Sequence, residues 1–311
     1  MQVFTTYTGL DEAARGAAVA IGNFDGVHLG HQAILVAARD QADRMNAPLG
    51  VLTFEPHPRS FFRPDDAPFR LMNAAAKAHR LEKLGVDVLF QVPFDADFAA
   101  LSAEAFCKDV LQDGLGATHV VVGQDFHFGK DRTGEASSLS DFGKTMGFGA
   151  TVAPLVALDA HEVSSTRIRA ALADARPEDA AAMLGHAHHI EGPVLHGEKR
   201  GRELGYPTAN MSLEGLHLPA FGVYAVEIDI LTGPDTGRHI GVASLGVRPM
   251  FGENTPNLET HIFDFSGDLY GQTLSVALVS YLRGEEKFDG LDALITQMDA
   301  DSAEARRRLG R

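Results

Sequence analysis

Two histidines three residues apart follow the first apolar stretch of the chain. His28 and His31 stand in segment 21–32, IGNFDGVHLGHQ, which leaves a short apolar run and enters a helical pattern. This spacing puts both imidazoles on one face at a helix N-terminus, where free N–H groups and the helix dipole attract anions. Gly26 and Gly30 allow close backbone approach. Two imidazole donors there could stabilise charge building on a phosphate during displacement at phosphorus. The alternative is a pair of capping or surface histidines.

Two distant segments suit the same chemistry. Segment 163–169, VSSTRIR, begins another helical pattern, and its hydroxyls could cap that helix or bind phosphate oxygens. Arg167 and Arg169 would add charge-assisted donors. Segment 122–130, VGQDFHFGK, leaves a buried strand with aromatic and polar residues that suit contact with a base or ring. Taken alone, the first segment also fits a simple capped helix and the second a packed loop.

A second group of candidate residues lies in segment 196–210, HGEKRGRELGYPTAN. Its glycines recur every fourth residue, so it is neither a Rossmann fingerprint nor a P-loop. The segment is basic and ends in two hard oxygen ligands, Thr208 and Asn210. Mg²⁺ takes a few such protein oxygens together with phosphate oxygens. An exposed hairpin loop with a proline turn is the alternative for this segment.

The elements that must position the first group alternate between strand and helix. Apolar runs predict strands, and apolar residues at helical spacing predict the helices between them. The expected strands are 17–22, 50–54, 86–92, 118–122 and 150–156, and the expected helices are 29–45, 74–84 and 103–112. This order predicts an α/β fold with a doubly wound, Rossmann-like parallel sheet. Ligands bind such sheets beyond the carboxyl ends of the strands, where these unusual residues fall.

The sequence pattern changes after residue 184. Segment 165–184 reads as a helix broken near Pro177, and short β-type runs separated by Gly and Pro follow it. These runs, 190–195, 223–230, 240–245, 258–265 and 275–282, predict a small antiparallel β-barrel, closed by a helix over 291–309. We therefore expect one domain over 1–184 and another over 185–311. His186, His188 and His189 at the junction are expected to be solvated linker residues rather than a metal cluster.

Composition narrows the classes of partner. Lys plus Arg is 27 and Asp plus Glu is 42, which gives a formal net charge of −15. That balance disfavours general binding to nucleic acid or to anionic membranes. A single cysteine excludes an intramolecular disulfide and favours a reducing cytoplasm. No apolar stretch is long enough to span a bilayer, and the N-terminus does not read as a signal peptide. The oligomeric state is left open.

The segments together resemble the bifunctional bacterial riboflavin kinase/FAD synthetase family over essentially the whole chain. GNFDGVHLGHQ at 22–32, TFEPHPR at 53–59, VGQDFHFG at 122–129 and SSTRIR at 164–169 resemble its nucleotidylyltransferase module. GRELGYPTAN at 201–210, GVYAV at 222–226 and LETHIFDF at 258–265 resemble its flavokinase module. The resemblance implies that ATP phosphorylates riboflavin to FMN, and that a second ATP then adenylylates FMN to FAD with release of pyrophosphate.

The resemblance implies roles in the first module. His28 and His31 would contact the reacting phosphates, and no protein nucleophile is needed because the FMN phosphate is already anionic. The residues implied to bind ATP with the histidines are Gly22, Asn23, Ser165, Thr166 and Arg169. The residues implied to form a flavin or nucleotide loop are Asp125, Phe126, Phe128 and Arg59.

It also implies roles in the second module. Glu259 would be the general base that takes the proton from the riboflavin 5′-hydroxyl. Thr208 and Asn210 would bind Mg²⁺ and ATP. The other residues implied to bind this ATP are Gly197, Gly201, Arg202 and Gly205. Arg283 could contact the flavin or its phosphate, with a surface ion pair as the alternative.

Several positions depart from the common family pattern, and none of these departures removes a residue assigned to chemistry. Segment 71–73, LMN, stands where Leu-Thr-Ser is more common. His127 stands where Arg is common, and Leu245 and Met250 stand where Asn and Thr are common. Two alternative functions are weighed beside the two-site enzyme. Only one module could be active, or the protein could be a non-catalytic flavin or nucleotide binder.

Overall fold

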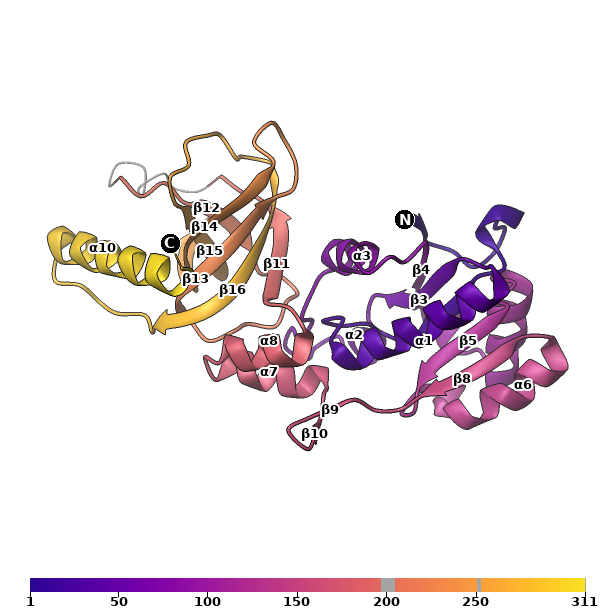
Figure 1. Cartoon of the computed structure of the whole chain (residues 1–311). Coiled ribbons are helices and arrows are strands. Elements are labelled where there is room, and N and C mark those ends of the chain that lie inside the picture. Colours follow the sequence, from indigo (N-terminus) through magenta and orange to yellow (C-terminus); the bar gives the residue numbers. More distant parts are fainter. Residues whose placement is uncertain (197–204, 251–252, 311) are drawn as a thin grey trace. The chain divides into compact units, whose positions relative to one another are not determined.

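The protein divides into two compact units. The structure is a computed structural model, and it describes residues 1–196, 205–250 and 253–310. The first unit comprises Met1–Ala67 and Lys77–Ser164, and the second comprises Pro68–Ala76 and Ser165–Arg311 (Figure 1). The short segment 68–76 belongs to the second unit because its polar groups bond there. Asn73 Nδ2 donates to the carbonyl of Glu191 at 2.8 Å, and the carbonyl of Arg70 accepts from the N–H of His217 at 2.8 Å.

A six-stranded, fully parallel sheet forms the centre of the first unit. The strands lie in the order β1-β4-β3-β2-β5-β8. Their bounds are β1 Gln2–Phe4, β2 Ala18–Ile21, β3 Leu49–Glu55, β4 Val88–Pro93, β5 His119–Gly123 and β8 Gly149–Ala153. β2 and β3 are almost wholly buried, as expected of a sheet covered on both faces. The predicted doubly wound fold is confirmed.

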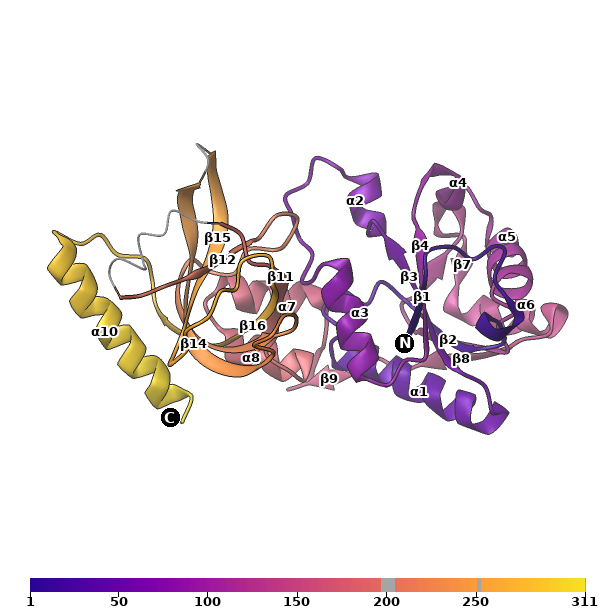
Figure 2. The same cartoon turned by 90° about the horizontal axis from the view of Figure 1, so that it is seen from above.

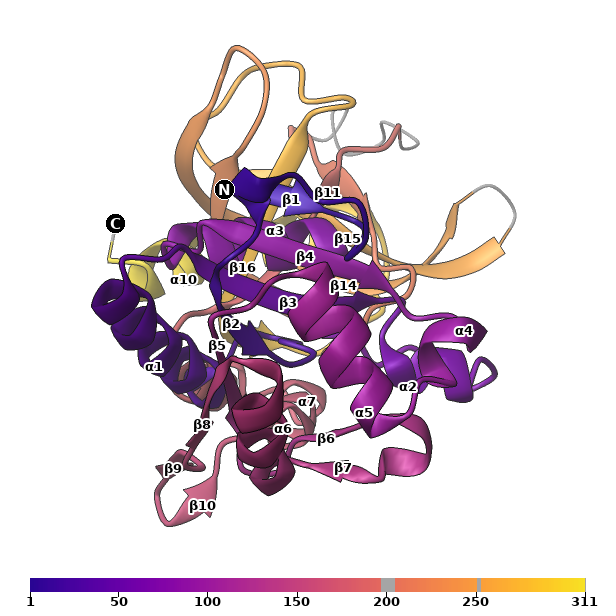
Figure 3. The ribbon, with the colours of Figure 1, turned by 90° about the vertical axis from the view of Figure 1, so that its right-hand side faces the viewer.

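Helices cover both faces of this sheet. Figure 3 shows α1 and α3 on one side and α5 and α6 on the other. The helices are η1 Glu12–Ala14, α1 Leu29–Met45, α2 Pro58–Phe62, α3 Ala74–Lys83, α4 Ala96–Ala99, α5 Ala103–Ala105, the π-helix η2 Phe106–Gly114, η3 Lys130–Arg132, η4 Ala136–Ser138 and α6 Leu139–Met146. The short hairpins are β6 His127–Phe128 with β7 Gly134–Glu135, and β9 Ala157–Leu158 with β10 His161–Glu162.

Local signals explain where several of these helices begin and end. Ser102 Oγ accepts from the N–H of Ala105 at 3.0 Å, which caps α5 as the sequence predicts. Gly85 follows α3 with φ of 80°, the left-handed conformation that stops a helix. The expected helix over 103–112 is instead one α-helical turn that continues as a π-helix.

An antiparallel, nearly closed barrel forms the centre of the second unit. Its strands lie in the order β11-β16-β13-β14-β15-β12. Their bounds are β11 His188–Pro193, β12 Ala209–Ser212, β13 Gly222–Ile230, β14 Gly237–Met250, β15 Glu253–Ile262 and β16 Thr273–Arg283. An isolated bridge between Leu195 and Asn210 joins the two ends of the sheet. Tyr224 and Leu245 are fully buried among the aliphatic residues of the barrel core, so Leu245 packs there and makes no polar contact.

Helices α7, α8 and α10 are found beside the barrel in the described part of the second unit. Pro177 begins α8 (Pro177–Leu184) and so separates it from α7 (Ser165–Ala173), which confirms the predicted break. Helix α10 (Leu291–Arg308) lies along one side of the barrel (Figure 2), where Arg308 bonds Ser280 Oγ at 2.6 Å. No helix within the described ranges is both long and apolar enough to cross a membrane.

The junction histidines are not all solvated, which corrects the expectation for His188. Its side chain is 3% exposed on β11, opposite Leu278 of β16. Burial, together with neighbouring His189, His186 and His217, lowers the pKa of His188 to about 3. The part of the chain that the structure describes contains no group of three or more His, Cys, Asp or Glu side chains that could hold a metal ion.

Burial of a neutral His188 predicts a pH-dependent stability. The unfolded chain protonates this imidazole near pH 6.5, whereas the folded chain does not until about pH 3. The free energy of unfolding therefore falls as the pH drops below 6.5, by about 2 kcal/mol at pH 5. We expect His188→Leu to lose less thermal stability between pH 7 and 5 than the wild type. His161→Gln, in the exposed β9–β10 hairpin, is the control and should follow the wild type. Equal acid sensitivity of His188→Leu and the wild type would contradict this assignment.

Candidate active sites

The histidine pair sits where the sequence places it, at the turn from β2 into α1. His28 is the N-cap of α1, and its Nδ1 accepts from the N–H of His31 at 3.3 Å. The two imidazole rings stack, with centroids 3.7 Å apart and planes within 17°. His28 can therefore both cap the helix and contact a phosphate, because the capping hydrogen bond orients its ring beside that of His31.

The loop before the pair is strained, and Gly30 just after it leaves room for the His28 ring. Phe24 and Val27 have φ of 50° and 44°, a conformation that a β-branched valine adopts very rarely. Such strain persists only where the surrounding structure enforces it, commonly at functional sites. A Cβ on Gly30 would lie 3.1 Å from the His28 ring, so glycine lets that ring lie against the helix.

His31 is held neutral. Burial, and then the neighbouring charges of His28 and Lys77, lower the pKa of His31 well below its usual value. Within the described part of the chain, its buried Nδ1 has no hydrogen-bond partner. A neutral imidazole offers one N–H donor, which suits a contact with a phosphate oxygen without fixing a permanent charge there.

Lys77 supports this turn, although no sequence motif indicates this role. Its side chain is 2% exposed. Its Nζ donates to the carbonyl of Asn23 and to Thr53 Oγ1, both at 3.1 Å, and pairs with Glu55 Oε1 at 2.9 Å. Lys77 thus ties the carboxyl ends of β2 and β3 together at the histidine loop. A lone lysine in a helical pattern is usually read as a solvent-facing residue.

Replacing Lys77 by methionine should destabilise the first unit. The change removes the ammonium that pairs with the Glu55 carboxylate, which is 17% exposed, and removing one partner of such a pair costs about 3 kcal/mol. Chemical denaturation of Lys77→Met measures this loss. The double variant Lys77→Met/Glu55→Gln should recover part of it, because both charges of the pair are then removed. A Lys77→Met protein as stable as the wild type would contradict the role of this pair.

Gly22 and Asn23 lie between β2 and the histidines. The Gly22 N–H donates to the carbonyl of Leu52 at 3.2 Å, which continues the pairing of β2 with β3. The Asn23 carbonyl accepts from Thr53 as well as Lys77, at 3.1 Å each. The strand-to-helix context predicted for this motif is therefore present.

Ser165, Thr166 and Arg169 begin α7, which belongs to the second unit. The Arg169 guanidinium lies over the Phe69 ring at 5.2 Å and donates through Nε to the Phe69 carbonyl at 2.5 Å. The predicted helix start is present. The role of these residues toward the triphosphate stays a prediction.

The loop after β5 lines a pocket of about 570 Å³. Phe126 and His127 contribute to its wall together with Glu135 and Val152. Phe128 is instead buried in the core, stacked on Phe126 with centroids 5.7 Å apart. Two further predicted residues, Asp125 and Arg59, do not line this pocket. Asp125 is exposed and its carbonyl bonds His127 Nδ1 at 2.8 Å, while Arg59, on α2, pairs with Asp66 at 2.9 Å.

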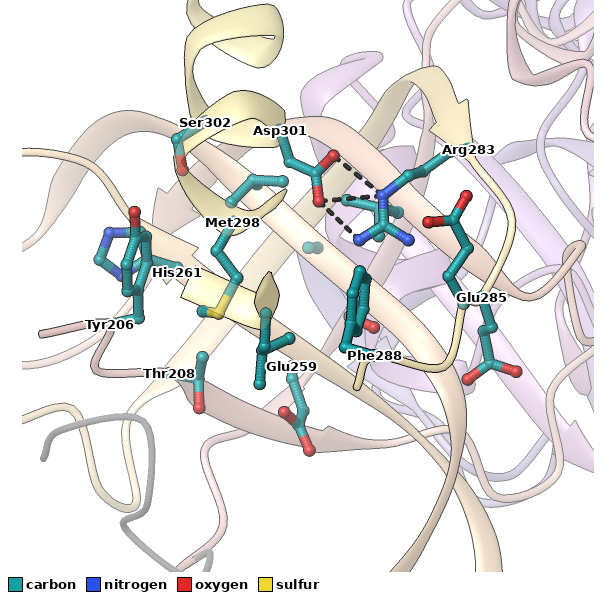
Figure 4. Close-up of a pocket in the computed structure, with 16 residues that line it drawn as sticks. Tyr206, Thr208, Glu259, His261, Arg283, Glu285, Phe288, Met298, Asp301 and Ser302 are labelled. Carbon is teal, nitrogen blue, oxygen red and sulfur yellow. Dashed lines mark hydrogen bonds and ion pairs between the residues drawn. The ribbon is translucent and has the colours of Figure 1, made fainter. Parts of the chain in front are cut away.

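The barrel brings the predicted kinase residues together. Asn210 of β12 lies directly opposite Glu259 of β15 in the antiparallel register, so their side chains share one face of the sheet. Thr208, just before β12, lines the same pocket as Glu259. Figure 4 shows Thr208 and Glu259 at the same end of this pocket, whose volume is about 150 Å³.

Thr208 also lines a second pocket of about 330 Å³. Its other walls include Val194, Phe265 and Tyr270. The segment that leads to Thr208 is anchored by His261, whose Nδ1 bonds the Pro207 carbonyl at 2.9 Å, and by Tyr206, whose hydroxyl bonds Asp299 of α10. Thr208 therefore borders both pockets of the barrel.

Arg283 takes part in an ion pair that is largely buried, with its side chain 18% and that of Asp301 8% exposed, rather than in the surface ion pair that was the alternative from the sequence. Its Nε and Nη2 donate to Asp301 of α10 at 2.9 and 2.7 Å (Figure 4). This pairing raises the pKa of Arg283. The side chain still lines the pocket that contains Glu259, near Phe288.

The glycine-rich loop is described only at its end. Gly197, Gly201 and Arg202 lie outside the described residues. Gly205 has φ of 83°, the left-handed conformation that glycine adopts without strain.

These features define a class of protein: a two-module, ATP-dependent transferase with an α/β nucleotidylyltransferase module and a flavokinase barrel. Residues 10–167 match the family model described as FAD synthetase, and residues 184–309 match the model described as riboflavin kinase. The chain belongs to the family of bifunctional riboflavin kinase/FMN adenylyltransferases. Both catalytic activities follow from the two modules.

The relatives cover nearly the whole chain. A bifunctional riboflavin kinase/FMN adenylyltransferase of Pseudomonas fluorescens is 44% identical over 307 residues, 98% of this chain and 97% of the relative. One of Escherichia coli (strain K12) is 39% identical over 295 residues, 95% and 93% of the two chains. A crystal structure titled as a macrolide-efflux protein from Streptococcus pneumoniae superposes with a TM-score of 0.82 at 31% identity and covers 98% of each chain.

Proposed function

We propose that this chain carries out its two activities at two separate groups of residues. The histidine pair of the first unit serves adenylyl transfer to FMN. Thr208, Asn210 and Glu259 of the barrel serve phosphorylation of riboflavin. The observation that supports this division most strongly is the barrel register, which sets a carboxylate directly opposite an amide oxygen ligand, beside a threonine that lines two pockets.

Adenylyl transfer needs alignment and charge stabilisation rather than a base. An oxygen of the FMN phosphate attacks the α-phosphorus of ATP, the bond from that phosphorus to the bridging oxygen breaks, and pyrophosphate leaves. His28 and neutral His31 donate hydrogen bonds to the charge that develops on these phosphates. The remaining residues proposed to bind this ATP are Gly22, Asn23, Ser165, Thr166 and Arg169.

The flavin of FMN is proposed to occupy the pocket beside the loop after β5. Phe126 offers a ring at the wall of that pocket, which suits stacking against an isoalloxazine. Asp125 and Arg59 complete the proposed flavin or nucleotide loop, and Phe128 supports it from the core through its stack on Phe126. His127, in place of the common arginine, also faces this pocket.

Phosphorylation of riboflavin differs from adenylyl transfer because its attacking group is a neutral alcohol, whose attack is assisted by a base. Glu259 accepts the proton of the 5′-hydroxyl while that oxygen attacks the γ-phosphorus of ATP, and ADP leaves. Thr208 and Asn210 supply neutral oxygen donors that fit Mg²⁺, which neutralises phosphate charge when it is bound. Gly197, Gly201, Arg202 and Gly205 are the proposed ATP loop, and Arg283 is proposed to face the flavin.

The module boundary and the setting of the enzyme are further parts of the proposal. The modules are residues 1–184 and 185–311, and the compact units of the structure change over between Ser164 and Ser165. The single cysteine supports a reducing cytoplasm as the compartment. The net charge of −15 supports small-molecule partners (riboflavin, FMN and ATP) over nucleic acid.

The proposal is tested by incubating the protein with riboflavin, ATP and Mg²⁺ and separating the flavins by chromatography. FMN should appear first and FAD after it, and omission of Mg²⁺ should stop FMN formation. FMN without FAD would mean that the first module is inactive. FAD formed only from supplied FMN would mean that the second is inactive. A protein that binds flavin but yields neither product would be a carrier.

A further inference from the structure

A buried asparagine joins the two proposed kinase groups. Asn257 lies on β15, two residues before Glu259, and its side chain is 4% exposed. Its Nδ2 donates to Asn210 Oδ1 at 3.2 Å and to Glu259 Oε1 at 3.4 Å. One side-chain amide therefore contacts both the proposed metal ligand and the proposed base.

The geometry of an amide makes this bridge directional. An NH₂ group has two hydrogens fixed in the amide plane, so it can serve two acceptors only if both lie in set directions. Asn257 and Glu259 are two apart on one strand and so share a face, and Asn210 is the cross-strand partner of Glu259 on that face. Strand register, rather than loop conformation, thus fixes all three side chains.

We propose that Asn257 is a positioning residue of the kinase step, which holds the Asn210 oxygen and the Glu259 carboxylate in their productive orientations. This inference rests on the proposed function of the barrel. Asn257 directs one lone pair of Asn210 Oδ1 to itself and leaves the other for a cation. Its second N–H contacts Glu259 Oε1 and so fixes the orientation of that carboxylate.

Loss of these two hydrogen bonds should affect turnover and metal-nucleotide binding together. Asn257→Leu keeps a similar volume but has no donor. We expect it to lower kcat for FMN formation by about 10- to 100-fold, the loss typical of a ligand's or base's supporting contact. The apparent KM for Mg²⁺–ATP should rise as well, and FAD formation from supplied FMN should stay at the wild-type rate.

Asn257→Asp gives a readout that a purely structural role would not move. A second carboxylate beside Glu259 disfavours ionisation of the base, so the acidic limb of the pH profile of kcat/KM should shift to higher pH. The other titratable or charged groups that line the Glu259 pocket are the same in variant and wild type: Tyr206, His261, Arg283, Glu285, Glu286 and Asp301.

Ser275→Ala is the matched control. Ser275 is a buried polar residue of the same barrel, and its hydroxyl bonds His189 and Glu191 rather than the kinase group. It should lose thermal stability but keep its kinase kcat and pH profile. If Asn257→Leu folds with wild-type kinase parameters, or if Asn257→Asp leaves the pH profile unshifted, the inference is wrong. If Asn257→Leu fails to fold, the pH profile of Asn257→Asp decides.

The outcome for Glu259→Gln separates this inference from the proposed function. An active Glu259→Gln kinase would refute the proposed base itself. An inactive Glu259→Gln kinase beside an unaffected Asn257→Leu kinase would refute only the positioning role.

Discussion

Replacing Glu259 by glutamine should lower riboflavin phosphorylation by about 10²- to 10⁴-fold, the usual contribution of a general base. Glutamine keeps the shape of the side chain but cannot accept the hydroxyl proton as a carboxylate does. The expected products from riboflavin, ATP and Mg²⁺ are therefore neither FMN nor FAD. Supplied FMN should still be converted to FAD at the wild-type rate, because adenylyl transfer uses an anion that needs no base.

The control for this result is another carboxylate of the barrel. Glu227 is an exposed residue of β13, and Glu227→Gln should keep both activities. Equal loss of both activities in Glu259→Gln would show that the variant damages the whole protein or that the two reactions share a site. Either result would overturn the division of labour.

Replacing His31 by glutamine should have the opposite effect on the two activities: it should slow FAD formation and leave FMN formation unchanged. Removal of one pre-oriented donor from a reacting phosphate costs about 10²- to 10³-fold in rate. FMN should therefore accumulate from riboflavin, with FAD formed very slowly. His28 still caps α1 in this variant, so the helix should remain intact.

Chromatography of the flavin products with time measures this effect. His161→Gln changes an exposed histidine of the same unit and should behave as the wild type. If His31→Gln makes FAD from FMN as fast as the wild type, the histidine pair has no part in adenylyl transfer. The strained turn that carries the pair would then serve folding alone.

The sequence predicts the fold well where an element is buried along its whole length. Strands β2, β3 and β5 are continuous apolar runs, and α1 has helical spacing, so local pattern and tertiary burial agree. The sequence pattern does not predict β1 or β12. β1 is three mostly exposed residues that pair only with β4, and β12 is a four-residue strand whose partner, β15, lies far along the chain.

The site residues also differ in how far the sequence predicts them. His28, His31, Thr208 and Asn210 are indicated by local motifs, because short-range spacing sets their geometry. Lys77 and Asn257 are not, because their roles depend on which strands become neighbours.

For His188 the prediction from the sequence is wrong. A histidine among other histidines at a domain junction suggests a solvated linker, but the pairing of β11 with β16 buries it. Whether a single polar residue is buried depends on the strand that pairs with its own strand. The residues next to it in the sequence do not identify that strand.

The most direct test of two separate catalytic centres is a mixing experiment. Glu259→Gln should stop at riboflavin and His31→Gln should stop at FMN, but an equimolar mixture with riboflavin, ATP and Mg²⁺ should produce FAD. The FMN released by the second variant is then adenylylated by the first. A mixture that accumulates FMN without FAD, while Glu259→Gln alone fails to convert supplied FMN, would contradict the account.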